Sequence, residues 1–163
     1  MILIALGANL PSAIHGTPRQ TLEAALVALA ASGVCVLARS RWYETAPVPV
    51  SDQPWYVNGV ASVATELSPI ALLALLHDVE CRFGRVRGAV NEARLVDLDI
   101  VDYEGRVEVG PPILPHPRAH ERGFVLLPLA DVAPRWHHPA TGLGVAELLA
   151  ALPPGQDIRV LPA

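Results

Sequence analysis

The hydrophobic and polar positions along the 163-residue chain follow two different periods. Two segments begin with a Ser or Thr cap followed by proline and carry apolar residues at helical spacing. The expected helices begin at Pro18 and Pro69 and are stopped by Gly33 and Gly84. Four other segments are rich in Leu, Val, Ile and Tyr, as strands are. The expected strands cover residues 1–7, 34–43, 56–66 and 95–101.

The resulting order, β-α-β-β-α-β, is the split βαβ or ferredoxin-like plan, an α+β fold with an antiparallel sheet and both helices on one face. Three prolines in the segment 44–54 exclude a helix or a central strand and stiffen that loop. We also expect a hairpin around Gly105 and short helices near Phe124–Leu129 and Val145–Leu152. No repeat or linker interrupts the pattern, so we expect a single domain over residues 1–163.

Composition narrows the possible classes of function. No apolar run approaches the 18 residues of a membrane span, and the first residues lack the basic start of a signal peptide. The two cysteines form no CxxC pattern, so we expect a cytoplasmic protein with reduced cysteines. A net charge of −4 gives no reason to expect nucleic-acid binding. All 12 basic residues are Arg, which excludes a phosphate-binding P-loop with its lysine.

Two aspartates on one expected strand are the first candidates for chemistry. Asp97 and Asp99 alternate with Val96, Leu98 and Ile100, so the acidic side chains share one face and the apolar ones the other. At about 7 Å, two such charges repel by about 2 kcal/mol at an effective dielectric constant near 20. A divalent cation would offset this repulsion, and carboxylates together with phosphate oxygens are usual Mg²⁺ ligands. The alternative is a solvated outer face.

Four arginines lie close to this strand in the sequence: Arg82, Arg85, Arg87 and Arg94. Such a cluster repels itself unless anions pair with it, and a polyphosphate fits that requirement. The alternative is salt bridging within the chain, to Glu80, Glu92 and the two aspartates. Together with the acidic pair, the cluster favours phosphate plus Mg²⁺.

A possible site for a flat heterocycle lies on the expected strand 56–66. Tyr56 and Asn58 share a face, and an aromatic ring beside an amide can hold such a ligand by stacking and hydrogen bonds. Phe124 is a candidate for the opposite side of the ring, although simple packing explains most such pairs. The histidines have no zinc-binding pattern. For His116, a phosphate-facing role and an ordinary loop position both stay open.

Several short segments together form a specific pattern through their order and spacing. They are Gly7-Ala8-Asn9-Leu10, Tyr43-Glu44-Thr45, Asp52-Gln53-Pro54, Tyr56-Val57-Asn58, Glu80, Gly84-Arg85-Val86-Arg87, Arg94 to Asp99, Pro115-His116 and Arg122-Gly123-Phe124. Through them the chain resembles the 6-hydroxymethyl-7,8-dihydropterin pyrophosphokinases of folate biosynthesis over nearly its whole length. The resemblance implies an αβα sandwich around the ferredoxin-like sheet. It also implies transfer of the pyrophosphoryl group of ATP to the pterin hydroxymethyl oxygen, with release of AMP.

The resemblance also assigns roles to individual residues. Asp97 and Asp99 would bind two Mg²⁺ ions that bridge ATP and the pterin hydroxyl, and Arg85 and Arg94 would neutralise charge on the moving group. The residues expected to help bind the nucleotide are Glu80, Arg87, His116 and Arg122. The residues expected to bind the pterin are Thr45, Val48, Tyr56, Asn58 and Phe124, with Tyr56 and Phe124 sandwiching the ring. Small molecules would be the only partners, with no nucleic acid or membrane, and the protein would be a monomer.

One segment departs from the family pattern. Residues 88–93 are about one residue shorter than the family's Arg-Trp-Gly-Pro-Arg loop and lack its Arg and Trp. An active pyrophosphokinase with impaired loop closure is therefore the first reading, and a homologue that binds pterin or nucleotide with little or no turnover is the second. A ferredoxin-like structural domain with solvated aspartates is the third, and the matched motifs disfavour it.

Overall fold

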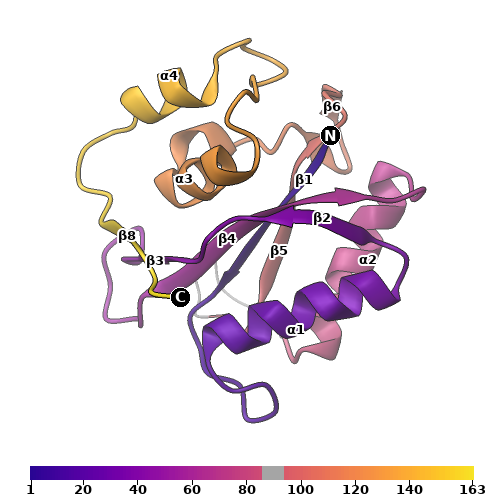
Figure 1. Cartoon of the computed structure of the whole chain (residues 1–163), viewed down its shortest axis with the longest axis vertical. Coiled ribbons are helices and arrows are strands. Elements are labelled where there is room, and N and C mark those ends of the chain that lie inside the picture. Colours follow the sequence, from indigo (N-terminus) through magenta and orange to yellow (C-terminus); the bar gives the residue numbers. More distant parts are fainter. Residues whose placement is uncertain (86–93) are drawn as a thin grey trace.

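One antiparallel sheet dominates the computed structural model, which describes residues 1–85 and 94–163 (Figure 1). Its strands are β1 (Ile2–Ala8), β2 (Cys35–Arg39), β3 (Tyr43–Thr45), β4 (Tyr56–Ala64), β5 (Asp97–Tyr103) and β8 (Ile158–Val160). They are ordered β5-β1-β4-β3-β8, and β2 pairs with a further part of β4. This arrangement confirms the expected α+β, ferredoxin-like plan.

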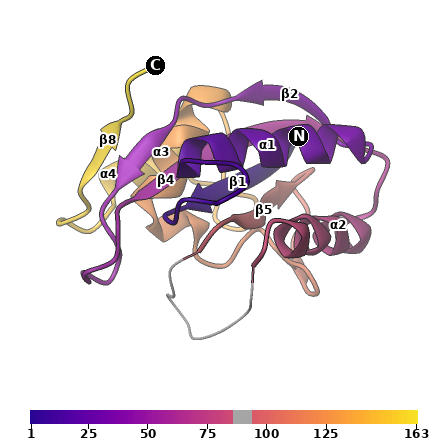
Figure 2. The same ribbon diagram turned by 90° about the horizontal axis from the view of Figure 1, so that it is seen from below.

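Helices cover both faces of the sheet, as Figures 1 and 2 show. They are α1 (Pro18–Ala31), α2 (Pro69–Arg82), the short 3₁₀ helix η1 (Ala119–Glu121), α3 (Gly123–Val132) and α4 (Val145–Ala150). Alternate residues of β1 separate two cores, with Ile4 and Leu6 packing on the α1–α2 side and Leu3 on the α3–α4 side. The side chains that face α3 therefore come from the strand positions that do not face α1 and α2.

The two long helices begin where the sequence predicts. The side chains of Thr17 and Ser68 cap α1 and α2, and each cap is followed by proline. The helices end shortly before Gly33 and Gly84, both with φ of 89°, a left-handed conformation that favours glycine. Local signals were therefore sufficient to place both helices.

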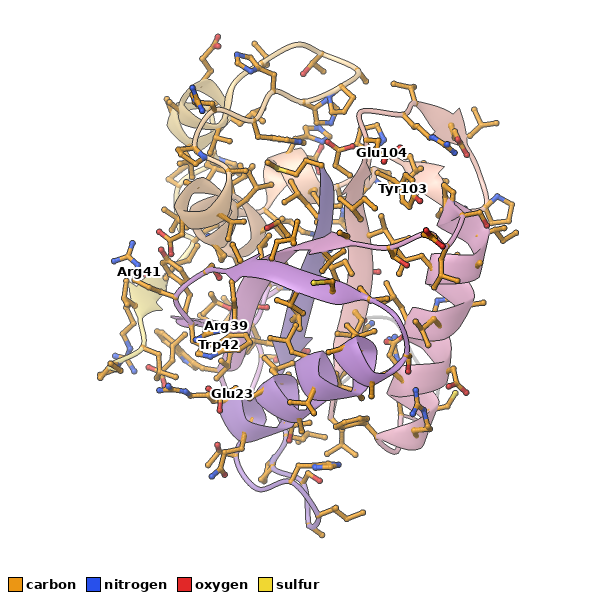
Figure 3. All side chains as sticks on the ribbon, turned by 45° about the vertical axis from the view of Figure 1, so that its right-hand side comes forward. Glu23, Arg39, Arg41, Trp42, Tyr103 and Glu104 are labelled. Atoms are coloured by element: carbon orange, nitrogen blue, oxygen red, sulfur yellow. The ribbon has the colours of Figure 1, made fainter. Side chains whose placement is uncertain are left out.

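The prediction of one strand over residues 34–43 was wrong. The chain leaves the ladder between β2 and β3, where Ser40 Oγ accepts a hydrogen bond from the Val60 N–H at 3.0 Å. This break turns the Trp42 side chain into the core, where it is 3 % exposed (Figure 3). A Cβ atom on Gly59 would lie 2.6 Å from the Trp42 ring, so the indole requires glycine on the neighbouring strand.

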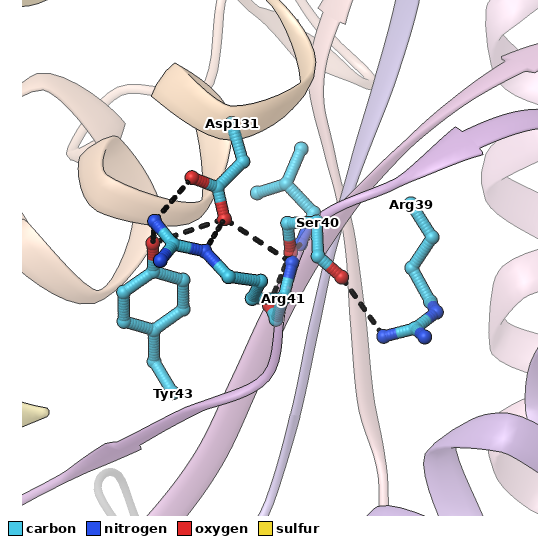
Figure 4. Close-up of polar contacts among 6 residues, drawn as sticks. Arg39, Ser40, Arg41, Tyr43 and Asp131 are labelled. Atoms are coloured by element: carbon cyan, nitrogen blue, oxygen red, sulfur yellow. Dashed lines mark hydrogen bonds and ion pairs between the residues drawn. The ribbon is translucent and has the colours of Figure 1, made fainter. Parts of the chain in front are cut away.

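The break between β2 and β3 is also tied to α3. Asp131 Oδ2 accepts hydrogen bonds from the Arg41 backbone N–H at 3.1 Å and the Tyr43 hydroxyl at 3.0 Å (Figure 4). Asp131 also accepts two bonds from the Arg41 guanidinium, from Nε to Oδ2 at 3.1 Å and from Nη2 to Oδ1 at 2.8 Å. These bonds fix the C-terminal half of α3 against the sheet.

The turn after β5 is confirmed, but the hairpin expected there was wrong. Glu104 and Gly105 have φ of 53° and 70°, and they turn the chain at the end of β5. The next strand, β6 (Glu108–Val109), pairs with β7 (Ile113–Leu114) instead of with β5. The Glu104 N–H donates to the Met1 carbonyl at 2.8 Å, so β5 ends beside the start of β1, close to the labelled Glu104 in Figure 3.

The C-terminal helices differ from expectation in length. α3 begins at Gly123, continues through Pro128 and ends at Val132, because its apolar side chains pack continuously on the sheet. α4 ends at Ala150, two residues before the expected end. Within the described parts of the chain, no helix is long and apolar enough to cross a membrane.

Candidate active site

A pocket opens where β1, β4 and β5 meet the start of α3. Six residues singled out in the sequence line it: Asn58, Asp97, Asp99, His116, Arg122 and Phe124. Thr45 and Tyr56 come from β3 and β4 and stand opposite each other in the ladder. Val48 lies on the following loop and is 58 % exposed. The fold thus gathers most of the candidate residues at one place.

The two aspartates lie on the predicted face of β5. Leu98 and Ile100 are buried in the core with α1 and α2, whereas Asp97 and Asp99 line the pocket on the other face. In the ladder Asp97 stands opposite Gly7 of β1. A Cβ on Gly7 would come within 2.8 Å of the Asn58 side-chain oxygen, so glycine there keeps the floor of the pocket open.

A chain of ion pairs leads from the buried Glu80, near the end of α2, to Asp97. Glu80 is 2 % exposed, and its carboxylate contacts Arg85 Nη1. The same nitrogen lies 2.8 Å from Asp97 Oδ1, and Arg94 Nη1 lies 2.6 Å from Asp97 Oδ2. Internal pairing, the alternative raised from the sequence, is thus realised for Arg85 and Arg94. It holds both guanidinium groups at the edge of the pocket.

One described member of the arginine cluster, Arg82, does not join this arrangement. Arg82 pairs instead with Asp78 on the surface of α2, at 3.0 Å. Arg87 and the atypical segment 88–93 lie outside the described residues. Among the described residues, the candidate site contains Arg85 and Arg94 from the cluster, together with Arg122 beside the start of α3.

Asn9 is a site residue that sequence reasoning missed. It is 1 % exposed, and its side-chain oxygen accepts from the Arg94 N–H at 2.8 Å. Its amide nitrogen donates to Gln53 Oε1 at 3.2 Å and to the Pro54 carbonyl at 3.1 Å. Asn9 therefore joins the backbone of Arg94 to the loop before Tyr56. Asn9, Gln53 and Pro54 belong to two of the family motifs, Gly7-Ala8-Asn9-Leu10 and Asp52-Gln53-Pro54, but the sequence does not show that these motifs are in contact.

The residues expected to bind the pterin include buried polar groups. Asn58 Nδ2 donates to Thr45 Oγ1 at 2.7 Å, and both residues are almost fully buried. The Tyr56 hydroxyl is 3.4 Å from Gln53 Oε1, and burial raises the pKa of Tyr56, so this phenol stays protonated near neutral pH. At the opposite wall the Arg122 guanidinium lies 5.5 Å from the centre of the Phe124 ring.

The surroundings shift the pKa values of two side chains in the pocket, Asp99 and His116. Burial, followed by repulsion from Asp97, raises the pKa of Asp99 to about 6, although part of its side chain is open to solvent. Burial and then the charge of Arg122 lower the pKa of His116 to about 4, so its imidazole is neutral at physiological pH. His116 Nδ1 accepts from the Arg118 N–H at 3.1 Å, and Nε2 lies 3.9 Å from Asp99 Oδ2. A cation near Asp99 would be favoured by this concentration of negative charge.

Fold and site together define an α+β protein with a paired-carboxylate, arginine-flanked pocket suited to phosphate chemistry. The chain matches the model of the 7,8-dihydro-6-hydroxymethylpterin-pyrophosphokinase family over residues 3–134. It belongs to this family. It is therefore an ATP-dependent diphosphokinase of the folate biosynthesis class.

Individual relatives agree with this placement. The chain is 38 % identical over 159 residues to the 2-amino-4-hydroxy-6-hydroxymethyldihydropteridine pyrophosphokinase of Methylorubrum extorquens, with 96 % of both chains covered. It is 39 % identical over 154 residues to the enzyme of the same name in Pseudomonas aeruginosa, covering 93 % of this chain and 91 % of that one. It is 40 % identical over 147 residues to the folic acid synthesis protein fol1 of Pneumocystis carinii. That match covers 89 % of this chain but only 19 % of the fol1 protein.

The solved structures support the fold. A triple mutant of Plasmodium falciparum HPPK-DHPS superposes with a TM-score of 0.69 at 14 % identity. The match covers 91 % of this chain and 43 % of the Plasmodium chain. At this identity the likeness shows a shared fold, and the chain corresponds to less than half of the fused protein.

Proposed function

We propose that this pocket is where the protein transfers pyrophosphate from ATP to the hydroxymethyl group of 6-hydroxymethyl-7,8-dihydropterin, releasing AMP. The observation that carries the assignment is Asp97, held between Arg85 and Arg94, in a pocket whose other wall carries Asn58 and Phe124. Charged groups for a polyphosphate and flat, polar groups for a heterocycle thus lie side by side. Transfer of this kind depends on such positioning and on electrostatic stabilisation.

An assay of AMP release tests this proposal against its alternative. We expect AMP to form only when ATP, Mg²⁺ and the pterin are all present. Release of AMP at the same rate without pterin would contradict the proposal. If both ligands bind but no AMP forms, the protein is the binding homologue with little or no turnover.

The carboxylate pair fits Mg²⁺. Among residues 1–85 and 94–163 no group of three or more His, Cys, Asp or Glu side chains could hold a metal ion by itself. This suits Mg²⁺, which is commonly bound through one or two carboxylates plus substrate phosphates and water. We propose that Asp97 and Asp99 hold two such ions when ATP binds. The ions would neutralise phosphate charge and orient the pterin oxygen.

The other charged residues would have different roles according to where they lie around the pocket. Arg85 and Arg94 would stabilise negative charge on the moving group while the pterin oxygen bonds to the β-phosphorus and the bond to the AMP oxygen breaks. Arg122 and the neutral His116 would contact the nucleotide from the α3 side, and Arg87 would assist them. Glu80 is buried against Arg85, so its contribution to nucleotide binding would act through that guanidinium.

The aromatic walls give a prediction about pterin binding. Tyr56→Ala and Phe124→Ala should each weaken pterin binding by about 1–3 kcal/mol, because burial and stacking are lost. Affinity for a non-hydrolysable ATP analogue should change much less. Calorimetric titration of both ligands measures the difference. Equal losses for both ligands would indicate a general defect in folding. They would count against binding of the pterin between Tyr56 and Phe124.

The sequence of residues 88–93 gives a prediction about rate. The Arg and Trp of the family's loop are missing there, so we expect slow transfer limited by chemistry instead of product release. Rapid-quench single turnover should give a rate close to steady-state turnover, without an initial burst of AMP. A clear burst would show that product release is slower than chemistry despite the altered loop.

We also propose that residues 1–163 form one domain and that the protein is a monomer. The two cores share the same central sheet, which supports a single cooperative unit. A single thermal transition and a light-scattering mass near 17.3 kDa are expected. Two separate transitions, or twice that mass, would contradict these proposals.

A further inference from the structure

The glycine of the Arg122-Gly123-Phe124 motif has no role in the chemistry described above, although its two neighbours line the pocket. A Cβ atom on Gly123 would lie 2.6 Å from Ile158 Cδ1 and 3.0 Å from Gln156 Oε1. Both contacts come from the C-terminal segment. Glycine at position 123 therefore lets the side chains of residues 156 and 158 lie directly against the start of α3.

Gln156 replaces the missing local cap of that helix. The first N–H groups of a helix have no partner within it, and Arg122 in the N-cap position makes no side-chain capping bond. Gln156 Oε1 accepts from the Gly123 N–H at 2.8 Å, and Gln156 Nε2 donates to the Glu121 carbonyl at 3.4 Å. One side chain thus binds the backbone on both sides of Arg122.

The same segment reaches the opposite wall of the pocket. Within β8, Ile158 pairs with Thr45 of β3, and Figure 1 shows β8 beside β3. The Ala46 N–H donates to the Asp157 carbonyl at 3.1 Å. Three consecutive residues, 156 to 158, therefore connect the strand that carries Thr45 to the start of α3, where Arg122 is the N-cap residue and Phe124 lies in the first turn. They lie beyond residue 134, where the family match ends.

We propose that Gln156 is a positioning residue for the pterin. By fixing the backbone around Gly123, it sets the distance between the Phe124 ring and the wall formed by Thr45 and Asn58. Gln156 itself does not line the pocket. This inference rests on the proposed function, because it assumes that the pterin binds between these walls.

The test compares Gln156→Ala with Gln156→Glu, which keeps an acceptor for the Gly123 N–H and gives up only the longer, 3.4 Å donation to the Glu121 carbonyl. Gln156→Ala should raise KM for the pterin about tenfold, while kcat and KM for ATP change less than about twofold. Gln156→Glu should restore KM to within about twofold of the unchanged protein. Arg19→Ala is the matched control, because Arg19 bonds the Pro162 carbonyl near the chain end without touching Gly123. It should leave KM unchanged.

Hydrogen exchange separates failure of this inference from failure of the proposed function. The Gly123 amide should exchange faster in Gln156→Ala than in Gln156→Glu, whether or not the protein turns over. Faster exchange with an unchanged pterin KM would overturn the positioning role, as would equal impairment of both Gln156 variants. Absence of pterin-dependent AMP release in the unchanged protein would instead overturn the function.

A second variant tests the close approach directly. Gly123→Ala should raise pterin KM because its methyl group collides with Ile158, and adding Ile158→Ala should recover part of the loss. Normal KM in Gly123→Ala, or no recovery in the double variant, would contradict the role assigned to the C-terminal segment.

Discussion

Replacing Asp99 with asparagine is expected to lower kcat/KM by about 1,000-fold without destabilising the fold. Asn keeps the size of the side chain but removes a charged ligand for Mg²⁺. Stability should be unchanged or slightly higher, because the raised pKa of Asp99 shows that its ionised form is disfavoured in the folded protein. Steady-state AMP release at limiting Mg²⁺ and a thermal melt at pH 8 measure the two effects.

The sign of the stability effect follows from proton binding. A carboxyl whose pKa is higher in the folded state holds its proton more tightly there, so stability falls as pH rises from about 4 towards 6. Asp99→Asn should remove this fall. Asp78→Asn is the control, because Asp78 pairs only with Arg82 among the residues described and lies away from the pocket. Near-normal activity of Asp99→Asn at limiting Mg²⁺ would show that the metal assignment is wrong.

The second large effect is expected at Arg85. Arg85→Met should reduce kcat by at least about 100-fold and also lower the melting temperature by about 6–12 °C. The stability loss arises because Glu80 is left buried without the cation that contacts it, a situation that costs about 3 kcal/mol. Thermal denaturation and AMP release should therefore both change.

A double variant separates the two consequences. In Glu80→Met with Arg85→Met, the buried pair is replaced by apolar side chains, so the melting temperature should recover while activity stays low. Recovery of activity together with stability would mean that Arg85 acts only by holding the structure. Persistent instability would mean that the ion pair is not the cause of the loss.

The parts of the fold that local sequence determines were predictable. The starts of α1 and α2 followed from a capping residue and proline, and the placement of Asp97 and Asp99 followed from strand alternation. Both depend on neighbours within a few residues, so no knowledge of the tertiary structure was needed.

The errors involve contacts between distant residues. The break between β2 and β3 depends on Ser40 bonding to Val60, and β5 ends beside Met1 instead of forming a hairpin. In the site, the bonds of Asn9 to Arg94 and of Gln156 to Gly123 join residues far apart in sequence. Neither composition nor periodicity contains that information, so these positioning residues became visible only in the folded structure.

The most direct test of the central claim is to identify which bond of ATP is broken. Phosphorus NMR of ATP, Mg²⁺ and 6-hydroxymethyl-7,8-dihydropterin with this protein should show AMP and the pterin diphosphate ester appearing in equal amounts. With Asp99→Asn, both signals should grow far more slowly and at the same ratio. Formation of ADP or free phosphate as the main product, or of AMP without the diphosphate ester, would contradict pyrophosphoryl transfer at this site.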